Sequence, residues 1–487
     1  MVYTPCGDKE ITKKNQNKLI ILTIMFSKET YIARRKALKE KMGSGLLLFL
    51  GNNFTGMNYA DNAYHFRQDS TFLYYFASDY EGLAAVIDID NDKEIIFGNE
   101  LTIDDIVWTG VQPTIKEKCE RVGIMLTRPM ADLATYIKDA QSKGQKIHFL
   151  PPYRGEHQVW LQELLGINPA EQAAKASLEF VKAVIAQRNY KSEEEIAQIE
   201  EAVNVSVDMH CAAMRALRPG MTEAQIVAVV QAEAQKHNFG LSFPIIATIN
   251  GQTLHNHAYG TTPLKDGQML LLDSGCENAM HYAGDLTSTI PVGKQFTEQQ
   301  RTVCNLLRRA HLTATSSLRP GIEYREVHKL VLTEIAKGMI DLGLMKGDPV
   351  EATVAGATCM FMPHGLGHMM GLDVHDMENL GEVNVGYEEG RTKSPLFGWK
   401  SLRLAKALEP GFVFTVEPGI YFIPDLIDKW RAEKQFTDFI CYDKLDAWKT
   451  FGGMRGEEDY YVFEGGARRL GKYKPMSPEE VEAEHNK

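Results

Sequence analysis

The sequence lacks the features of membrane proteins, of disulfide-rich secreted proteins and of nucleic-acid-binding proteins. No run approaches the roughly 20 apolar residues that a membrane-spanning helix needs. The seven cysteines are scattered without a Cys-x-x-Cys pair, so they indicate neither a disulfide framework nor a zinc knuckle. Positive charge is not in excess, because the formal net charge is -11, and an acidic surface repels phosphate backbones. We therefore expect a cytoplasmic protein that binds neither membranes nor nucleic acid.

The remaining composition is that of a soluble globular protein, with 44% hydrophobic and 24% charged residues. The length of 487 residues indicates two or three domains. Residues 1–24 are expected to be a disordered or non-native start. They contain several lysines and a short apolar run without a small-residue cleavage site, and a charged helix opens at Ser27.

The first third of the chain predicts an α/β domain without a catalytic cluster of its own. Four segments are predicted to be extended: Gly45–Gly51, Phe66–Phe76, Leu83–Ile89 and Lys93–Phe97. The last two flank Asp-Asn-Asp, which is a hairpin signal. We place this N-terminal domain at residues 25–165 and a linker at 166–177.

The following domain, placed at residues 178–475, shows signs of an internal duplication. A long helix begins near Ser192, which has Glu195 three residues later as its capping-box partner. That helix leads to Leu217-Arg-Pro-Gly220, and another helix leads to Leu318-Arg-Pro-Gly321. The two junctions lie 101 residues apart (321 minus 220), and a second helix follows each of them. This arrangement predicts two related halves with the active site between them.

A stretch rich in histidine and glycine, Phe361–Asp376, marks the chemistry of this domain. His364, His368 and His375 lie within twelve residues of one another, and the first two are one turn apart. The glycines between them disfavour an ordinary packing helix, because each costs about 1 kcal/mol relative to alanine. They suit a backbone that must approach another part of the structure closely.

Four carboxylates stand in conspicuous motifs: Asp273 and Glu417 on apolar strands, Asp285 in a Thr-rich run, and Glu457 in the Gly-rich stretch Gly452–Asp459. Carboxylates that converge in a buried cleft repel one another and become protonated unless cations neutralise them. Two divalent ions would do so. A ligand set of mostly oxygen with few imidazoles and no thiolate favours a hard metal such as Mn²⁺, with Co²⁺ or Zn²⁺ as alternatives. Bound metal ions of this kind acidify a water molecule and polarise a carbonyl group.

These motifs resemble the pita-bread metallopeptidases, which include methionine aminopeptidase, aminopeptidase P and prolidase. The resemblance covers about residues 178–470 and implies an α+β fold class. A C-terminal pita-bread fold with pseudo-twofold halves would follow a smaller α/β N-terminal domain. It also implies a set of five metal ligands: Asp273, Asp285, His368, Glu417 and Glu457.

The resemblance also assigns roles to residues that do not bind metal. His255, His364 and His375 match histidines that orient the substrate and stabilise the tetrahedral intermediate. Glu417 is the candidate general base and acid that carries the proton to the proline nitrogen. We predict that Arg455, two residues before the ligand Glu457, binds the substrate.

An N-terminal domain is typical of the proline-specific branch, and within it the chain most resembles prolidase. Arg403 matches an arginine thought to hold the carboxylate of an Xaa-Pro dipeptide, a role that suits the planar guanidinium. The sequence therefore favours a dipeptidase. An aminopeptidase P that acts on longer peptides is the alternative, and a peptide-binding pseudoenzyme is a distant one. Trp108 resembles a tryptophan that reaches the neighbouring subunit's active site, which predicts a homodimer.

Overall fold

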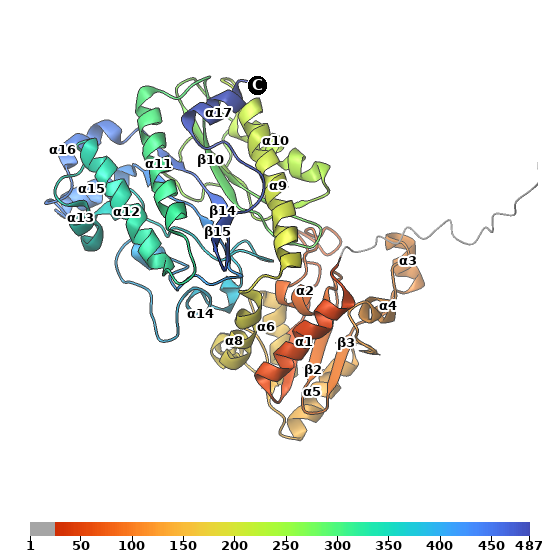
Figure 1. Cartoon of the computed structure of the whole chain (residues 1–487). Coiled ribbons are helices and arrows are strands. Elements are labelled where there is room, and N and C mark those ends of the chain that lie inside the picture. The colour runs from red at the N-terminus through yellow and green to blue at the C-terminus, as the bar shows by residue number, and fades with distance from the viewer. Residues whose placement is uncertain (1–24) are drawn as a thin grey trace, which may run out of the picture.

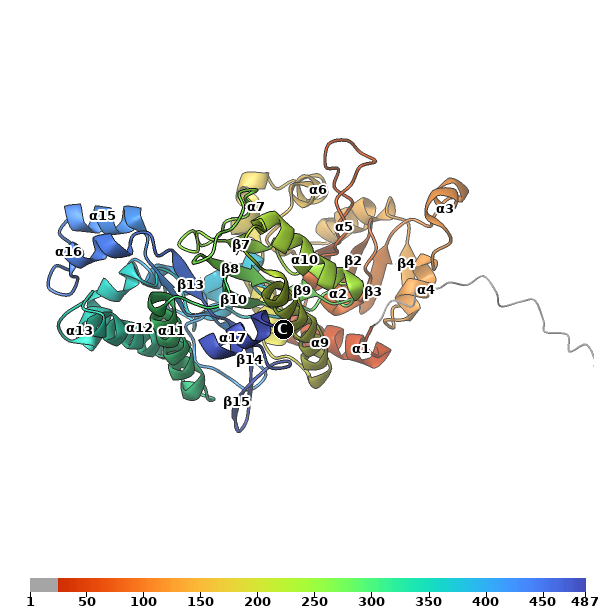
Figure 2. The same cartoon turned by 90° about the horizontal axis from the view of Figure 1, so that it is seen from above.

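The computed structural model describes residues 25–487, so the expectation for residues 1–24 lies outside the described residues. Figures 1 and 2 show a smaller N-terminal domain, coloured red to gold, beside a larger C-terminal domain, coloured from yellow through green to blue. Within residues 25–487, no helix has both the length and the apolar composition needed to cross a bilayer.

The N-terminal domain is built on a five-stranded mixed sheet with the strand order β4-β3-β2-β1-β5. The predicted hairpin of β2 and β3 is confirmed, with Asp88 opposite Lys93. The predicted strand at Gly45–Gly51 is also confirmed as β1. The strands are β1 (Leu46–Leu50), β2 (Ala84–Asp88), β3 (Lys93–Phe97), β4 (Leu126–Arg128) and β5 (Ile147–His148).

Alternate residues of this sheet enter two separate hydrophobic clusters, as the period of two in a strand requires. Leu46 and Leu48 face α5 and α6, whereas Leu47 and Phe49 face α1, α2 and α8. The helices of this region are α1 (Lys28–Met42), α2 (Ser70–Phe76), α3 (Ile103–Thr109), α4 (Ile115–Glu120), α5 (Asp132–Ser142), α6 (Gly155–Leu165), α7 (Pro169–Lys175) and α8 (Leu178–Arg188).

The prediction that Phe66–Phe76 is extended is wrong, because most of it forms α2. Asp69 caps this helix by accepting a hydrogen bond from the backbone N–H of Phe72 at 2.8 Å. Every residue of α2 is buried, so the aromatic run has no polar face and its sequence shows no helical period.

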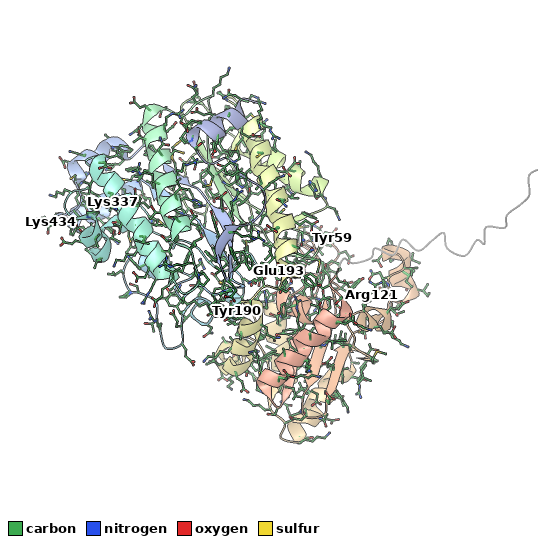
Figure 3. All side chains as sticks on the ribbon, viewed as in Figure 1. Tyr59, Arg121, Tyr190, Glu193, Lys337 and Lys434 are labelled. Carbon is green, nitrogen blue, oxygen red and sulfur yellow. The ribbon has the colours of Figure 1, made fainter. Side chains whose placement is uncertain are left out.

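The contact between the two domains is extensive and partly ionic. Helix α7 lies within the expected linker, and Phe180 of the following α8 packs edge-on against Phe49 of β1, with ring centroids 5.2 Å apart. Tyr190 and Glu193 mark the junction in Figure 3. Arg67 of the N-terminal domain forms an ion pair with Glu277 at 3.2 Å, and Ser70 of α2 donates to Asp373, which belongs to the predicted histidine stretch, at 2.5 Å. The N-terminal domain therefore supports the loop that carries the site histidines.

The C-terminal domain contains two helix pairs with the same junction. The Leu-Arg-Pro-Gly sequences join α9 (Glu193–Ala216) to α10 (Glu223–Lys236) and α11 (Glu298–Ser317) to α12 (Tyr324–Asp341). Gly220 donates its backbone N–H to Leu264, and Gly321 donates to Leu408, both at 2.8 Å. Leu264 precedes Asp273 by nine residues (273 minus 264), and Leu408 precedes Glu417 by nine (417 minus 408). The repeat therefore positions an equivalent carboxylate in each half.

Each half also contributes an antiparallel strand pair. In the first half β8 pairs with β10, and in the second β11 pairs with β14. A bridge between Thr287 and Glu457 joins the two sheets. The strands of this domain are β6 (Gly240–Leu241), β7 (Ile246–Thr248), β8 (Met269–Ser274), β9 (Cys276–Glu277), β10 (Leu286–Pro291), β11 (Val413–Val416), β12 (Gly419–Tyr421), β13 (Gly453–Arg455), β14 (Glu458–Phe463) and β15 (Gly466–Arg469).

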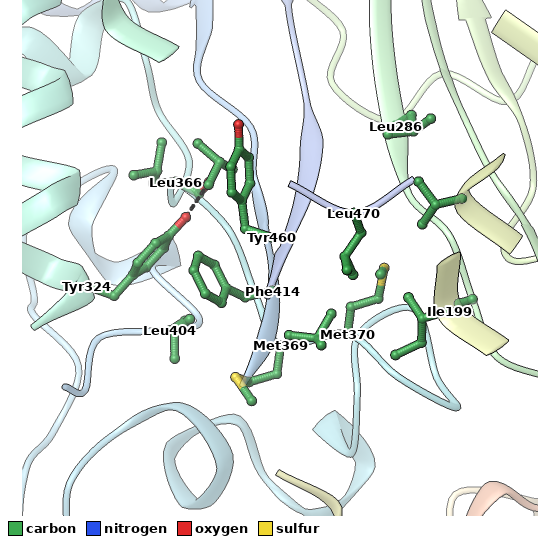
Figure 4. Close-up of a cluster of buried hydrophobic side chains, with 14 of the residues drawn as sticks. Ile199, Leu286, Tyr324, Leu366, Met369, Met370, Leu404, Phe414, Tyr460 and Leu470 are labelled. Atoms are coloured by element: carbon green, nitrogen blue, oxygen red, sulfur yellow. Dashed lines mark hydrogen bonds between the residues drawn. The ribbon is translucent and has the colours of Figure 1, made fainter. Parts of the chain in front are cut away.

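Hydrophobic side chains from both halves form the core beneath the histidine stretch, and Figure 4 shows Tyr324, Phe414 and Met369 among them. Tyr324 donates a hydrogen bond to the carbonyl of Thr415 at 2.6 Å, which fixes β11 to α12. The remaining helices are α13 (Pro349–Ala355), η1 (Ala357–Met360), η2 (Glu378–Leu380), α14 (Glu382–Gly386), η3 (Trp399–Ser401), α15 (Pro424–Ala432), α16 (Tyr442–Leu445), η4 (Asp446–Trp448) and α17 (Pro478–His485).

Candidate active site

Three of the five predicted metal ligands offer one atom each within 4.8 Å of one another: Asp285, His368 and Glu457. All three are buried. The other two lie beside them. His368 Nε2 is 3.6 Å from Glu417 Oε1, and Asp273 stands opposite Thr287 in the register of β8 and β10. The structure therefore brings four carboxylates and one imidazole into a single buried region.

The path of the loop around residue 368 explains how the imidazole reaches the carboxylates. The loop runs along β11, with hydrogen bonds from Thr415 N to the His368 carbonyl and from Glu417 N to the Leu366 carbonyl. A Cβ on Gly367 would lie 2.1 Å from the carbonyl oxygen of Thr415, so only glycine fits. His368 Nδ1 donates to the Met369 carbonyl at 3.0 Å, which leaves Nε2 free to bind a metal.

The electrostatics of this cluster fit bound cations. Burial, with Asp285 and Asp273 nearby, raises the pKa of Glu417 to about 7. Burial and the same neighbours hold the pKa of Glu457 well above its ordinary value. Although burial opposes it, the pKa of His368 rises to about 9 because Asp285 and Glu417 face the ring. The buried Asp273 Oδ1 accepts no hydrogen bond within the described chain. The site holds several crowded carboxylate oxygens and one imidazole, and one of these oxygens accepts no hydrogen bond. Such a set of metal ligands suits two divalent ions.

A chain of hydrogen bonds links His364 to the carboxylate of Asp273. His364 lies 2.9 Å from the Tyr421 hydroxyl through Nε2 and 2.7 Å from the Gly365 carbonyl through Nδ1. Arg455 donates to the same hydroxyl at 2.9 Å and to Asp273 at 2.5 Å. Burial, with Arg455 adding to it, lowers the pKa of His364 to about 3, so the ring is neutral.

The remaining predicted residues differ in their distance from this centre. The His375 ring stacks on His368 at 3.8 Å between centroids, and its Nδ1 lies 3.0 Å from Glu378. His255 is exposed as a residue. Partial burial of its ring and the positive charges of Arg455 and Arg403 lower its pKa. Trp108 lies on α3 of the N-terminal domain and is 86% exposed.

Comparison with known proteins agrees with this geometry. Residues 197–464 match the model of metallopeptidase family M24, and residues 31–150 match that of the aminopeptidase P N-terminal domain. The chain belongs to metallopeptidase family M24. The resemblance seen in the sequence and the expected two-part α+β fold are therefore confirmed.

Individual relatives in this family include both proline-specific types. The chain is 30% identical to Xaa-Pro dipeptidase of Mus musculus, over 87% of this chain and 85% of the relative. It is 28% identical to Xaa-Pro aminopeptidase of Escherichia coli, over 94% and 97%. Proline aminopeptidase P II from Yersinia pestis has a similar structure, with a TM-score of 0.79 and 25% identity, over 95% of this chain and all of that chain.

Three residues at the site of this M24 protein were not assigned from the sequence. Asp459 is fully buried and accepts a hydrogen bond from the backbone N–H of Asp285 at 3.1 Å, which orients that ligand candidate. Tyr421 joins His364 to Arg455. Glu378 contacts both His375 and Arg403. Asp459 lies two residues after Glu457, and Tyr421 lies four residues after Glu417, so their nearness to predicted ligands was a signal, whereas nothing in the sequence pointed to Glu378.

Proposed function

We propose that this M24 protein hydrolyses the peptide bond before proline at a two-metal centre. The observation that carries the proposal is the convergence of Asp285, His368 and Glu457 beside two further carboxylates in one buried region. The names of the relatives support the substrate class, because both types act on Xaa-Pro bonds. A pseudoenzyme that only binds peptides would not need so many buried, mutually repelling carboxylates.

Five side chains would hold the ions: Asp273, Asp285, His368, Glu417 and Glu457. We propose Mn²⁺ because four of the five donors are carboxylates, although Zn²⁺ occupies the related E. coli aminopeptidase P in its Zn-substituted, product-bound structure. When bound, such ions would acidify a water molecule and polarise the scissile carbonyl.

The residues of the chain supply the proton transfers and the orientation of the substrate. Glu417, whose Oε1 lies 3.6 Å from His368 Nε2, can take a proton from the attacking water and deliver it to the proline nitrogen. Neutral His364 and the stacked His375 face the same region, where they can orient the carbonyl oxygen as negative charge develops on it. His255 stands at the exposed edge and contributes to holding the substrate.

Substrate length depends on Arg403. From the sequence, its free guanidinium would hold a dipeptide carboxylate. In the structure Arg403 is paired with Glu378 at 2.5 Å and with Glu382 at 2.9 Å, which favours the aminopeptidase alternative.

Assembly as a homodimer is part of the proposal. Ile103, Val107 and Trp108 on α3 are each more than 70% exposed, and such an apolar cluster suits burial against a second copy. A mass of one chain at micromolar concentration would contradict the dimer. A cytoplasmic location accords with the six free cysteines among the described residues.

One experiment tests the activity. Metal-stripped protein is titrated with Mn²⁺, Co²⁺ or Zn²⁺, and the hydrolysis of Ala-Pro and Ala-Pro-Ala is measured at each ratio. We expect activity to appear as two ions bind, with Mn²⁺ most effective. Binding of a peptide without hydrolysis at any metal ratio would identify a pseudoenzyme.

A further inference from the structure

Two glutamates share one nitrogen, Nη1, of the Arg403 guanidinium at the rim of the proposed active site. Arg403 Nη1 donates to Glu378 Oε2 at 2.5 Å and to Glu382 Oε1 at 2.9 Å. Lys393 forms an ion pair with Glu382 as well. Two carboxylates and two cations sum to no net charge, so a third carboxylate would find little attraction at this place.

The segment that carries these glutamates is built in a fixed conformation. Glu378 begins η2 directly after Met377, a fully buried residue in the left-handed conformation at φ 60°. Such a conformation persists only where the surroundings enforce it, and it is common at functional sites. A Cβ on Gly386, at the end of α14, would lie 1.8 Å from the Arg403 carbonyl oxygen, so the glutamate segment packs directly on the arginine segment.

Glu378 also faces the reactive centre and has an acceptor to spare. Its Oε2 contacts His375 Nδ1 at 3.0 Å, and the His375 ring stacks on His368. Its other oxygen, Oε1, is shielded from solvent and has no hydrogen-bond donor within the described chain. A buried carboxylate oxygen without a donor is costly, and a substrate N–H would satisfy it once the Glu378 side chain turns Oε1 towards the substrate.

We propose that Glu378, with Glu382, makes the site select peptides that continue beyond the proline, so that these two residues determine substrate length. This inference rests on the proposed Xaa-Pro hydrolysis. A longer peptide presents an amide N–H after the proline, and Glu378 can accept a hydrogen bond from it. A dipeptide presents a carboxylate there, for which this charge-balanced cluster offers no net attraction, because Nη1 of Arg403 is already paired with both glutamates.

The test compares Ala-Pro, Ala-Pro-amide and Ala-Pro-Ala on the full-length, metal-loaded protein. Ala-Pro-amide differs from Ala-Pro only in replacing the terminal carboxylate with a neutral N–H donor. We expect kcat/KM of the wild type to be at least tenfold higher for the amide and the tripeptide than for Ala-Pro. Glu378→Gln keeps the shape of the side chain but removes its charge. It should lower the ratio of kcat/KM for Ala-Pro-amide to that for Ala-Pro about tenfold. The change should lie in KM, with kcat for the amide little changed.

A double variant identifies the route of the effect. Glu378→Gln frees Arg403 for the dipeptide, so Arg403→Ala added to it should cancel the gain in Ala-Pro hydrolysis. Glu389→Gln, at an exposed glutamate paired with Lys182, is the control and should leave the ratio unchanged. If Glu378→Gln does not fold, Glu382→Gln must shift the ratio in the same direction.

The outcomes separate the two proposals. One outcome is that all three substrates are hydrolysed while neither glutamate variant changes the ratio of kcat/KM for Ala-Pro-amide to that for Ala-Pro by more than twofold. That result overturns the length selection alone. A wild type that cleaves Ala-Pro faster than Ala-Pro-amide also overturns it. No hydrolysis of any of the three refutes the proposed function, and the length selection with it.

Discussion

The two halves of the C-terminal domain share a scaffold but differ in what they add to it. Each has a helix pair joined at Leu-Arg-Pro-Gly and a strand pair that carries two carboxylates, as Figure 1 shows for α9 and α10 against α11 and α12. The connection that follows the helix pair covers residues 237–268 in the first half and 342–412 in the second. The longer connection contains His364, His368, His375, Glu378 and Arg403.

This difference separates two tasks. The shared elements position carboxylates, two from each half, and so they build the proposed metal centre. The longer connection supplies His364, His368 and His375 and the charged rim that would recognise the substrate, whereas the shorter one supplies His255. Changes in shared elements should therefore affect both halves alike, whereas changes in the added connection should alter substrate preference.

The largest effect is expected from one carboxylate of each half. Asp285→Asn and Glu457→Gln should each lose metal and activity, since a neutral amide would not balance the charge of the cations that these residues would hold. The loss should exceed the roughly 10–100-fold seen when an outer partner of a metal ligand is removed. Bound metal per chain and turnover are measured together. Asp208→Asn, at a surface ion pair on α9, is the control. Retained metal in either variant would contradict a centre shared by both halves.

The next effect concerns Arg455, which joins the halves. It is 4% exposed and donates to Asp273 in the first half and Tyr421 in the second. Arg455→Met should destabilise the metal-free protein by about 3–5 kcal/mol, because a buried carboxylate loses its partner charge. Arg468→Met breaks a surface pair with Glu200 and should cost about 0–1 kcal/mol. Equal shifts in melting temperature would show that Arg455 does not bind the halves together.

Much of this organisation could be predicted from the sequence because it follows from local rules. The Ser192 capping box, the hairpin around Asp90 and the repeated junctions depend on a few neighbouring residues. Two features could not be predicted. Helix α2 (Ser70–Phe76) is buried on all sides and has no period, and the pairing of Arg403 with Glu378 joins residues 25 apart that no local pattern connects.

A third test uses two buried histidines at equivalent places, His210 and His311, each seven residues before the junction leucine. Burial lowers the pKa of His210 to about 3 and that of His311 to about 4. Both are neutral in the folded protein at pH 5, whereas an unfolded histidine titrates near pH 6.5. Since the unfolded state binds more protons below that pH, stability is lost as the pH falls from 7 to 5, by about 2 kcal/mol for each histidine.

The change in melting temperature between pH 7 and pH 5, in metal-free protein, checks this prediction. His210→Gln and His311→Gln should each remove a similar part of the acid destabilisation, and the double variant should remove both parts. A pH dependence that only one of the two variants alters would show that the halves bury their histidines differently.

The smallest effect is expected at the junction glycines. Gly220 and Gly321 have φ of 92° and 84°, and a Cβ on either would meet no atom within 4 Å. Alanine there costs only the backbone strain of a left-handed residue, about 1–2 kcal/mol, partly offset by the roughly 0.4–1 kcal/mol gained by restricting the unfolded chain.

Because both glycines donate the same hydrogen bond to an equivalent leucine, Gly220→Ala and Gly321→Ala should lower the melting temperature equally, by a few degrees at most. Asparagine at either position should cost less, since it tolerates the left-handed conformation. Gly155→Ala is the matched control, because its Cβ also meets open space but its φ is not positive, so no loss is expected. The two losses of unfolding free energy could differ by more than about 0.5 kcal/mol, the usual error of additivity. In that case the two junctions would contribute unequally to stability, although the halves are alike in sequence.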